Sequence, residues 1–233
     1  MKNQLNTPVL FIVFNRPITT SKVFEVIKKV KLVRKIATAV DWPCELRTLF
    51  SDANLGMKIA ESKAMTWFFE NEKEGIILED DCLPHQDFFT FCQKLLYHYY
   101  DYQNIIAITG NNFQNGIWRG DGSYYFSKYN HCWGWATWKR AWSHYQDEIK
   151  FWSEWKNSND WHNYITDKIE RKRWEKIFDE VYAGQIDSWA YPWTASAWFK
   201  KGLTVTPNVN LVSNIGFRDD ATHTLDSNDK NAN

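Results

Sequence analysis

The sequence has little of several features that would place a protein in a functional class at once. Its 28 basic and 28 acidic side chains cancel, so the basic excess of nucleic-acid-binding proteins is missing and we expect no nucleic-acid partner. The longest strongly apolar run, residues 9–14, is far too short to cross a bilayer. Because residues 1–7 are polar and Asn15-Arg16-Pro17 follows the run at once, we expect no signal peptide.

Cysteine is also scarce. The 4 cysteines show no paired spacing of the kind that metal or redox sites have. This pattern predicts reduced thiols in a cytoplasmic protein. Tryptophan, in contrast, is abundant: the chain has 14, and eleven of them lie between Trp133 and Trp198.

The first half of the chain alternates apolar runs with helical periodicity. Strands are predicted at residues 9–14, 44–50, 75–78 and 105–108, and helices near 17–30, 32–40, 59–68 and 84–100. Strands that alternate with helices of about a dozen residues predict an α/β fold with a mostly parallel sheet, covered by helices on both faces.

The second half has a different pattern. Residues 111–130 are rich in Gly, Asn and Ser, which predicts loops and short irregular strands. Residues 136–201 are predicted to be helical, residues 203–206 to form a strand, and residues 218–233 to be a mobile tail. We therefore expect one domain over residues 1–217, with halves 1–110 and 111–217.

Three consecutive acids, Glu79-Asp80-Asp81, follow the predicted strand at residues 75–78. Ligands of open α/β sheets bind beyond the carboxyl ends of the strands. Adjacent carboxylates repel one another unless a cation offsets their charge, and Mn²⁺ or Mg²⁺ prefers such oxygen ligands together with substrate phosphates. The triplet therefore predicts a divalent-metal site for a diphosphate. An acidic turn before a helix is the alternative.

The acids and their surroundings resemble a known family. Ile76–Pro84 and the aromatic helix after it are similar to the Glu-Asp-Asp motif of the N-acetylglucosaminyltransferase I family, and closer to bacterial nucleotide-diphospho-sugar transferase-like proteins. The resemblance covers nearly the whole chain through four further motifs in order: Phe14–Pro17, Asn54–Gly56, His131–Trp138 and Asp220–Thr224. It implies the GT-A glycosyltransferase architecture, a Rossmann-like sheet with a Trp-rich helical lobe on the acceptor side.

The resemblance implies a donor site. Asp81, with Asp80 or Glu79, would hold Mn²⁺ or Mg²⁺, and His223 would ligate the metal or contact the diphosphate. The remaining residues implied to bind the nucleotide sugar are Asn15, Arg16, Asn54, Gly56 and Lys58. A solvated surface side chain is the alternative for Arg16 and for His223, and a simple helix cap is the alternative for Asn54 and Gly56.

Asp187 resembles the acid that acts as catalytic base in the inverting family. Its position just before a predicted helix is explained equally by an N-cap role. Trp133 and Trp189 lie next to predicted loops and, with Trp135, are candidates for stacking on an acceptor sugar. Trp135 also falls at helical spacing with other tryptophans, a pattern more typical of a core.

One expected strand is missing. Proteins that resemble this one carry a second strand and a base-binding loop after the first helix, whereas here Val30-Lys31 runs straight into Leu32. A parallel sheet without that inner strand would leave helix faces uncovered, so we expect that a segment near Lys31 is absent from the sequence.

The function expected is transfer of a sugar from a nucleotide-diphosphate donor, more specifically a UDP-sugar, to a hydroxyl of a glycan, lipid-linked or protein-linked acceptor. We expect a cytoplasmic protein, including a peripheral position at the inner face of the membrane, and the resemblance implies a role in bacterial surface polysaccharide or protein glycosylation. A sugar-1-phosphate nucleotidyltransferase is one alternative, although the Gly-rich loop that it needs is missing after residues 9–14. A non-catalytic carbohydrate-binding protein is the other.

Overall fold

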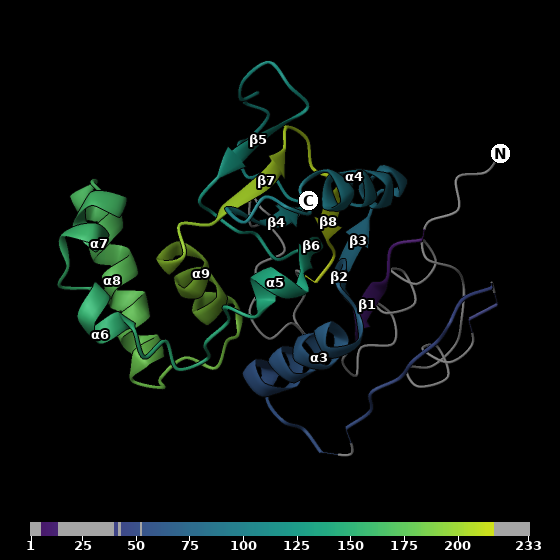
Figure 1. The fold of residues 1–233 in the computed structure, drawn as a ribbon, viewed down its shortest axis with the longest axis horizontal. Coiled ribbons are helices and arrows are strands. Elements are labelled where there is room, and N and C mark those ends of the chain that lie inside the picture. The colour runs from purple at the N-terminus through teal and green to yellow at the C-terminus, as the bar shows by residue number, and fades with distance from the viewer. Residues whose placement is uncertain (1–5, 14–39, 42, 52, 217–233) are drawn as a thin grey trace.

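The structure is a computed structural model that describes residues 6–13, 40–41, 43–51 and 53–216. Figure 1 shows the arrangement of its strands and helices. The strands are β1 (Val9–Ile12), β2 (Glu74–Glu79), β3 (Cys82–Pro84), β4 (Ile105–Thr109), β5 (Tyr124–Ser127), β6 (Trp135–Trp138), β7 (Leu203–Pro207) and β8 (Val212–Asn214). The helices are α3 (Met57–Asn71), α4 (Gln86–His98), α5 (Lys139–Trp142), α6 (Trp152–Trp155), α7 (Asn159–Tyr164), α8 (Lys168–Tyr182) and α9 (Ala190–Phe199).

The main sheet has six strands in the order β1-β2-β6-β4-β7-β5. The pairs β1–β2 and β4–β7 are parallel, and β6 and β5 pair antiparallel with their neighbours. Strands β1, β2, β4 and β7 therefore run in one direction and end at the same edge. The predicted α/β fold is confirmed, but the sheet is mixed.

Strand β6 differs from the prediction, which made this part of the chain helical. All four of its residues are buried, and Ala136 pairs with Ile76 of β2 on one side and Ile108 of β4 on the other. Trp135 and Trp138 consequently face opposite sides of the sheet, because side chains alternate along a strand. A spacing of three residues fits a helix face equally well, which is why the periodicity gave the wrong element.

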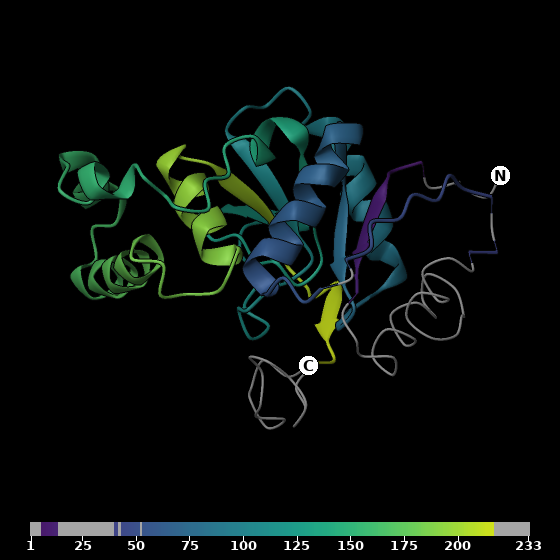
Figure 2. The same ribbon diagram turned by 90° about the horizontal axis from the view of Figure 1, so that it is seen from below.

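Helices cover both faces of the sheet (Figure 2). On one face, Ile77 and Trp135 pack in a cluster with residues of α3 and α9, including Phe68 and Trp193. On the other face, the members of the second cluster come mainly from the sheet and from α4: they include Ile76, Leu78, Ala136, Trp138, Phe88 and Leu96. Burial on both faces explains why these strands are continuous apolar runs in the sequence.

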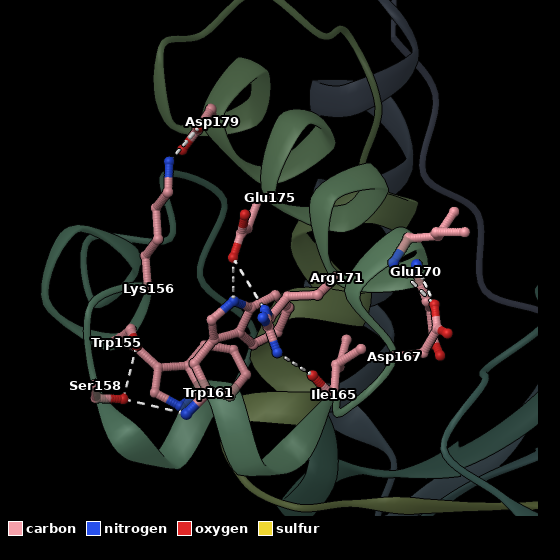
Figure 3. Close-up of polar contacts among 11 residues, drawn as sticks. Trp155, Lys156, Ser158, Trp161, Ile165, Asp167, Glu170, Arg171, Glu175 and Asp179 are labelled. Carbon is pink, nitrogen blue, oxygen red and sulfur yellow. Dashed lines mark hydrogen bonds and ion pairs between the residues drawn. The ribbon is translucent and has the colours of Figure 1, made fainter.

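Helices α6, α7 and α8 lie beyond α9, away from α3 and α4 (Figures 1 and 2). Trp152 and Trp161 are 1% and 0% exposed, and their rings meet edge to face with centroids 4.9 Å apart. The indole N–H of Trp161 donates to Glu175 at 3.0 Å, and Arg171 donates to the carbonyl of Ile165 beside it (Figure 3). Buried rings whose indole N–H groups have hydrogen-bond partners are typical of a core.

Two further expectations can be compared with the structure. Residues 44–50, predicted as a strand, are exposed and have no regular secondary structure. The helices predicted near 17–30 and 32–40, and the segment around Lys31, lie outside the described residues. Among the residues that are described, no helix has both the length and the apolar character that crossing a membrane requires.

Candidate functional site at the carboxyl edge of the sheet

The acidic triplet lies where β2 ends. Glu79 is the last residue of β2 and pairs with Ile12, the last residue of the parallel strand β1. Asp80 and Asp81 then form the turn between β2 and β3. The sequence therefore predicted correctly that the acids lie at the end of a buried strand, at the edge where α/β sheets bind ligands, although the first of them, Glu79, still belongs to the strand.

The acids of the turn are buried rather than solvated. Asp80 is 1% exposed and Asp81 is 8% exposed. The main chain fixes the turn, because the N–H of Ile215 donates to the Asp81 carbonyl at 2.8 Å. Gly216 lies against the Asp81 side chain so closely that a Cβ at residue 216 would clash with Asp81 Oδ2. Burial of two adjacent carboxylates requires strong compensation from neighbouring groups.

Negative charge at this edge acts on two neighbouring thiols. Burial raises the pKa of Cys82, and the charges of Glu79 and Asp81 raise that pKa further. Burial also raises the pKa of Cys132, with added contributions from Glu79 and from Glu61 of α3. The charge of Glu61 thus also acts on the Cys132 thiol, and the sequence reasoning missed this residue because it lies within a helix and belongs to no motif.

Asp187 lies at the N-terminal end of α3. Its Oδ1 accepts a hydrogen bond from the backbone N–H of Lys58 at 3.2 Å. Its Oδ2 lies 3.1 Å from the place that a Cβ on Gly56 would take, and Gly56 has a φ of +74°, which favours glycine. Asn54 shapes the same loop by accepting the N–H of Gly56 at 3.0 Å. The predicted donor-site residues 54, 56 and 58 and the predicted base therefore lie together.

This contact corrects the N-cap alternative for Asp187. The N-cap residue of α9 is Trp189, which has no side-chain capping bond, whereas Asp187 contacts the first turn of α3. Since α3 ends just before β2 begins and runs back along the sheet, its N-terminal end lies on the side where β2 ends. Asp187 and the acidic triplet thus both lie toward the edge of the sheet at which β2 ends.

The three tryptophans predicted to contact an acceptor have different environments in the structure. Trp135 and Trp189 are 1% and 2% exposed, and their rings stack with centroids 5.6 Å apart at 17°. The prediction that these two contact a sugar is therefore corrected: both are enclosed in the core. Trp133 is only partly buried and packs edge to face against Phe113, with centroids 5.1 Å apart.

Trp133 and Phe113 line a cleft of about 400 Å³ that the sequence analysis did not identify. Six asparagines line the same cleft: Asn111, Asn112, Asn115, Asn208, Asn210 and Asn214. The signal in the sequence was the pair of asparagine-rich segments after β4 and β7, two parallel strands that end at one edge. Asn214 pairs with Cys82, the residue after the acids, so the cleft adjoins the acidic turn.

Three predicted site residues cannot be compared with the structure. Asn15, Arg16 and His223 lie outside the described residues. Within the described ranges, no three His, Cys, Asp or Glu side chains converge as a ready-made metal-binding group. Magnesium sites that bind nucleotides commonly use one or two carboxylates and take further ligands from the phosphates. The oxygen chemistry of the acidic turn fits such a site.

The sequence was also compared with known proteins. No protein-family model matches the chain, and no curated protein is similar enough to count as a match.

Proposed function

We propose that this protein is a metal-dependent glycosyltransferase of the GT-A type. It would move a sugar from a nucleotide-diphosphate donor, such as a UDP-sugar, to a hydroxyl of a glycan or of a lipid- or protein-linked acceptor, in the cytoplasm or at the inner face of the membrane. The observation that carries the proposal is the gathering of the buried acids after β2, Asp187 and the asparagine-lined cleft at one side of the sheet. The resemblance of residues 76–84 and 131–138 supports the same class.

The acidic turn is the proposed metal site. Asp81, with Asp80 or Glu79, would hold Mn²⁺ or Mg²⁺, and His223 is a further candidate ligand. The bound ion would offset the negative charge that develops on the departing diphosphate. Burial strengthens this electrostatic effect, because charges interact more strongly away from water. Gly216 leaves room for that carboxylate, because a Cβ at residue 216 would clash with Asp81 Oδ2.

Asp187 is the proposed general base. The N–H of Lys58 orients its carboxylate through Oδ1, and Oδ2 has no hydrogen bond to any part of the chain that the structure describes. Oδ2 would take the proton of the acceptor hydroxyl while the hydroxyl oxygen bonds to the anomeric carbon and the bond from that carbon to the phosphate oxygen breaks. Attack from the face opposite the diphosphate would invert the anomeric configuration.

The experiment is a panel of nucleotide sugars tested with Mn²⁺ by thermal shift and by slow donor hydrolysis. We expect one donor to raise the melting temperature only when Mn²⁺ is present. Asp81→Asn, which preserves the size of the side chain, should lower turnover of that donor about 100-fold or more. Asp121→Asn, in an exposed loop, is the matched control and should retain activity. A flat response to every donor would overturn the proposal.

A further inference from the structure

The asparagine-lined cleft is assembled by two chain segments that follow parallel strands. The segment after β4 and the segment after β7 are tied together where the N–H of Leu211 donates to the carbonyl of Gly110 at 2.8 Å. Gly110 in turn donates its N–H to Gly134, next to Trp133, at 2.8 Å. The cleft of about 400 Å³ is thus built on the sheet edge and falls in the size range of small-molecule sites.

Two of the asparagines hold the walls together. Asn112 donates to the carbonyl of Pro207 at 2.6 Å and accepts the N–H of Gln114 at 2.8 Å. Asn208 accepts the N–H of Arg119 at 2.8 Å and donates to the carbonyls of Arg119 and Gly122, each at 2.8 Å. Both amides use their oxygen and their nitrogen in hydrogen bonds within the protein, so they give the cleft a fixed shape.

Three other amides are only half used. Asn111 is 2% exposed and donates to the carbonyl of Val212 at 3.3 Å, but its buried Oδ1 has no hydrogen-bond partner in the described part of the chain. Asn210 accepts the N–H of Asn112 at 2.6 Å, and Asn214 accepts the N–H of Gly216 at 2.7 Å. The amide nitrogens of Asn210 and Asn214 form no hydrogen bond with the described residues. A buried polar atom without a partner is costly, and among the three this applies to Oδ1 of Asn111, whereas Asn210 is an exposed residue.

The lining is polar but uncharged. Among the residues that the structure describes, Asn, Gly, Val, Phe and Trp line it, with no Lys, Arg, Asp, Glu or His. Asn214 is the neighbour of the acidic turn through its pairing with Cys82. An anionic ligand in this cleft would find no cation in the described lining and would lie next to carboxylates. Its charge would therefore stay unpaired, which costs binding free energy. Amide groups suit hydroxyl and N-acetyl groups, and an aromatic wall suits the apolar face of a sugar ring.

We propose that this cleft binds an uncharged saccharide, a hexose or N-acetylhexosamine unit, and rejects uronic acids and other anionic sugars. Under the proposed function, on which this role rests, the bound saccharide is the acceptor. Asn111, Asn210 and Asn214 hydrogen-bond its polar groups, and Phe113 with Trp133 forms the wall along its ring.

The test uses saturation-transfer NMR on the full chain, with and without UDP and Mn²⁺. The probes are the methyl glycosides of glucose, galactose, mannose and N-acetylglucosamine, compared with methyl glucuronide, which differs from methyl glucoside only by its carboxylate. We expect at least one uncharged glycoside to bind and the glucuronide to bind at least about fivefold more weakly, as expected when an ionised group is left unpaired. Binding of no glycoside, or equal binding of the glucuronide, would overturn the inference.

A charge substitution locates the site. Asn210→Asp preserves the oxygen that accepts the N–H of Asn112 and replaces only the amide nitrogen, so it should weaken binding of the uncharged glycoside about fivefold or more. Asn163→Asp, at an exposed position of α7, makes the same change in charge and should leave binding unchanged. Unchanged binding by Asn210→Asp, with a melting temperature like that of the parent, would also refute the assignment.

This outcome is separable from that of the donor experiment. Glycoside binding without any response to nucleotide sugars would retain the cleft as a saccharide site and reject the transferase. Donor hydrolysis that depends on Mn²⁺, without glycoside binding in either arm, would reject the cleft and retain the transferase.

Discussion

The carboxylate of Asp187 and the backbone N–H of Lys58 are joined by a hydrogen bond of 3.2 Å between residues 129 positions apart. The acid that precedes α9 thereby occupies the N-terminal end of α3, where a negative charge is favoured by the helix dipole. This contact joins the two halves of the chain, which the pairing of β6 with β2 and β4 also connects. It also means that Asp187 has a structural role in addition to the proposed catalytic one.

Two substitutions distinguish these roles. Asp187→Asn retains an oxygen that can accept the Lys58 N–H, so it should cost only a few tenths of a kcal/mol of stability while abolishing the proposed base. Asp187→Ala removes both the oxygen that accepts the Lys58 N–H and the proposed base, and it should lower the free energy of unfolding by about 1 kcal/mol. Urea unfolding and donor turnover, measured on both variants, check this. If Asp187→Asn transferred sugar at the parent rate, Asp187 would be only a helix cap.

Gly216 should tolerate no side chain. A Cβ at this residue would clash with Oδ2 of Asp81 and come within 2.9 Å of its Cβ. Gly216→Ala should therefore displace the acidic turn, destabilise the protein by about 1–3 kcal/mol and weaken any response to Mn²⁺. Gly122→Ala is the control, since its nearest neighbour would be a carbonyl at 3.4 Å. Equal melting temperatures for the two variants would contradict the packing described.

His131 predicts a specific pH dependence. Burial lowers the pKa of His131 to about 4 from its ordinary value of 6.5. Between these values the unfolded chain binds a proton that the folded chain does not, so this contribution to stability is complete above pH 6.5 and is lost as the pH falls toward 4. The full loss is about 3 kcal/mol at most.

The measurement is urea unfolding of the parent and of His131→Asn between pH 7.5 and pH 4.5. The parent should lose stability more steeply than the variant below about pH 6.5, because only the parent carries the imidazole. Parallel pH profiles would show that His131 titrates normally in the folded state.

The tryptophans of the second half should divide into two groups on mutation. Trp189→Ala removes a ring that is 2% exposed and stacked on Trp135, so it should cost about 3–5 kcal/mol. Trp118→Ala, at a residue 56% exposed, should change stability by no more than about 0.5 kcal/mol. Thermal unfolding of the two variants is the check, and a mild effect of Trp189→Ala would restore that ring as a candidate for contacts outside the core.

Much of the fold could be predicted from continuous apolar runs. Strands β2 and β4 were predicted within a residue or two of their bounds, because a strand buried on both faces cannot contain a polar residue without a cost. Strand β7 was predicted equally closely, although its buried residues include Thr204 and Thr206. The acids after β2 were found for the same reason, since they end such a run. Residues 44–50 contain polar residues throughout and carry no equivalent constraint, and the weak alternation seen there was not strand structure.

The site could be predicted only in part. Asp187 was singled out, but its contact with Lys58 is tertiary, and no local pattern encodes a capping bond between distant residues. The role of Trp135 was predicted wrongly because ring type alone does not say whether a tryptophan faces a sugar or another indole. The asparagine-lined cleft was missed because its residues come from two separate segments, each of which resembles an ordinary loop.

Strand β6 has a consequence for how the chain is made. It sits between β2 and β4, although it follows both in the sequence. On the ribosome, the apolar edges of β2 and β4 must therefore wait for residues 135–138 to emerge before they acquire this shared neighbour. Non-local pairing of this kind slows folding and exposes nascent strands to aggregation. A fragment ending at residue 110 would lack β6 and leave the facing edges of β2 and β4 unpaired. Because the acidic turn follows β2, this fragment is not suitable for studying the turn on its own.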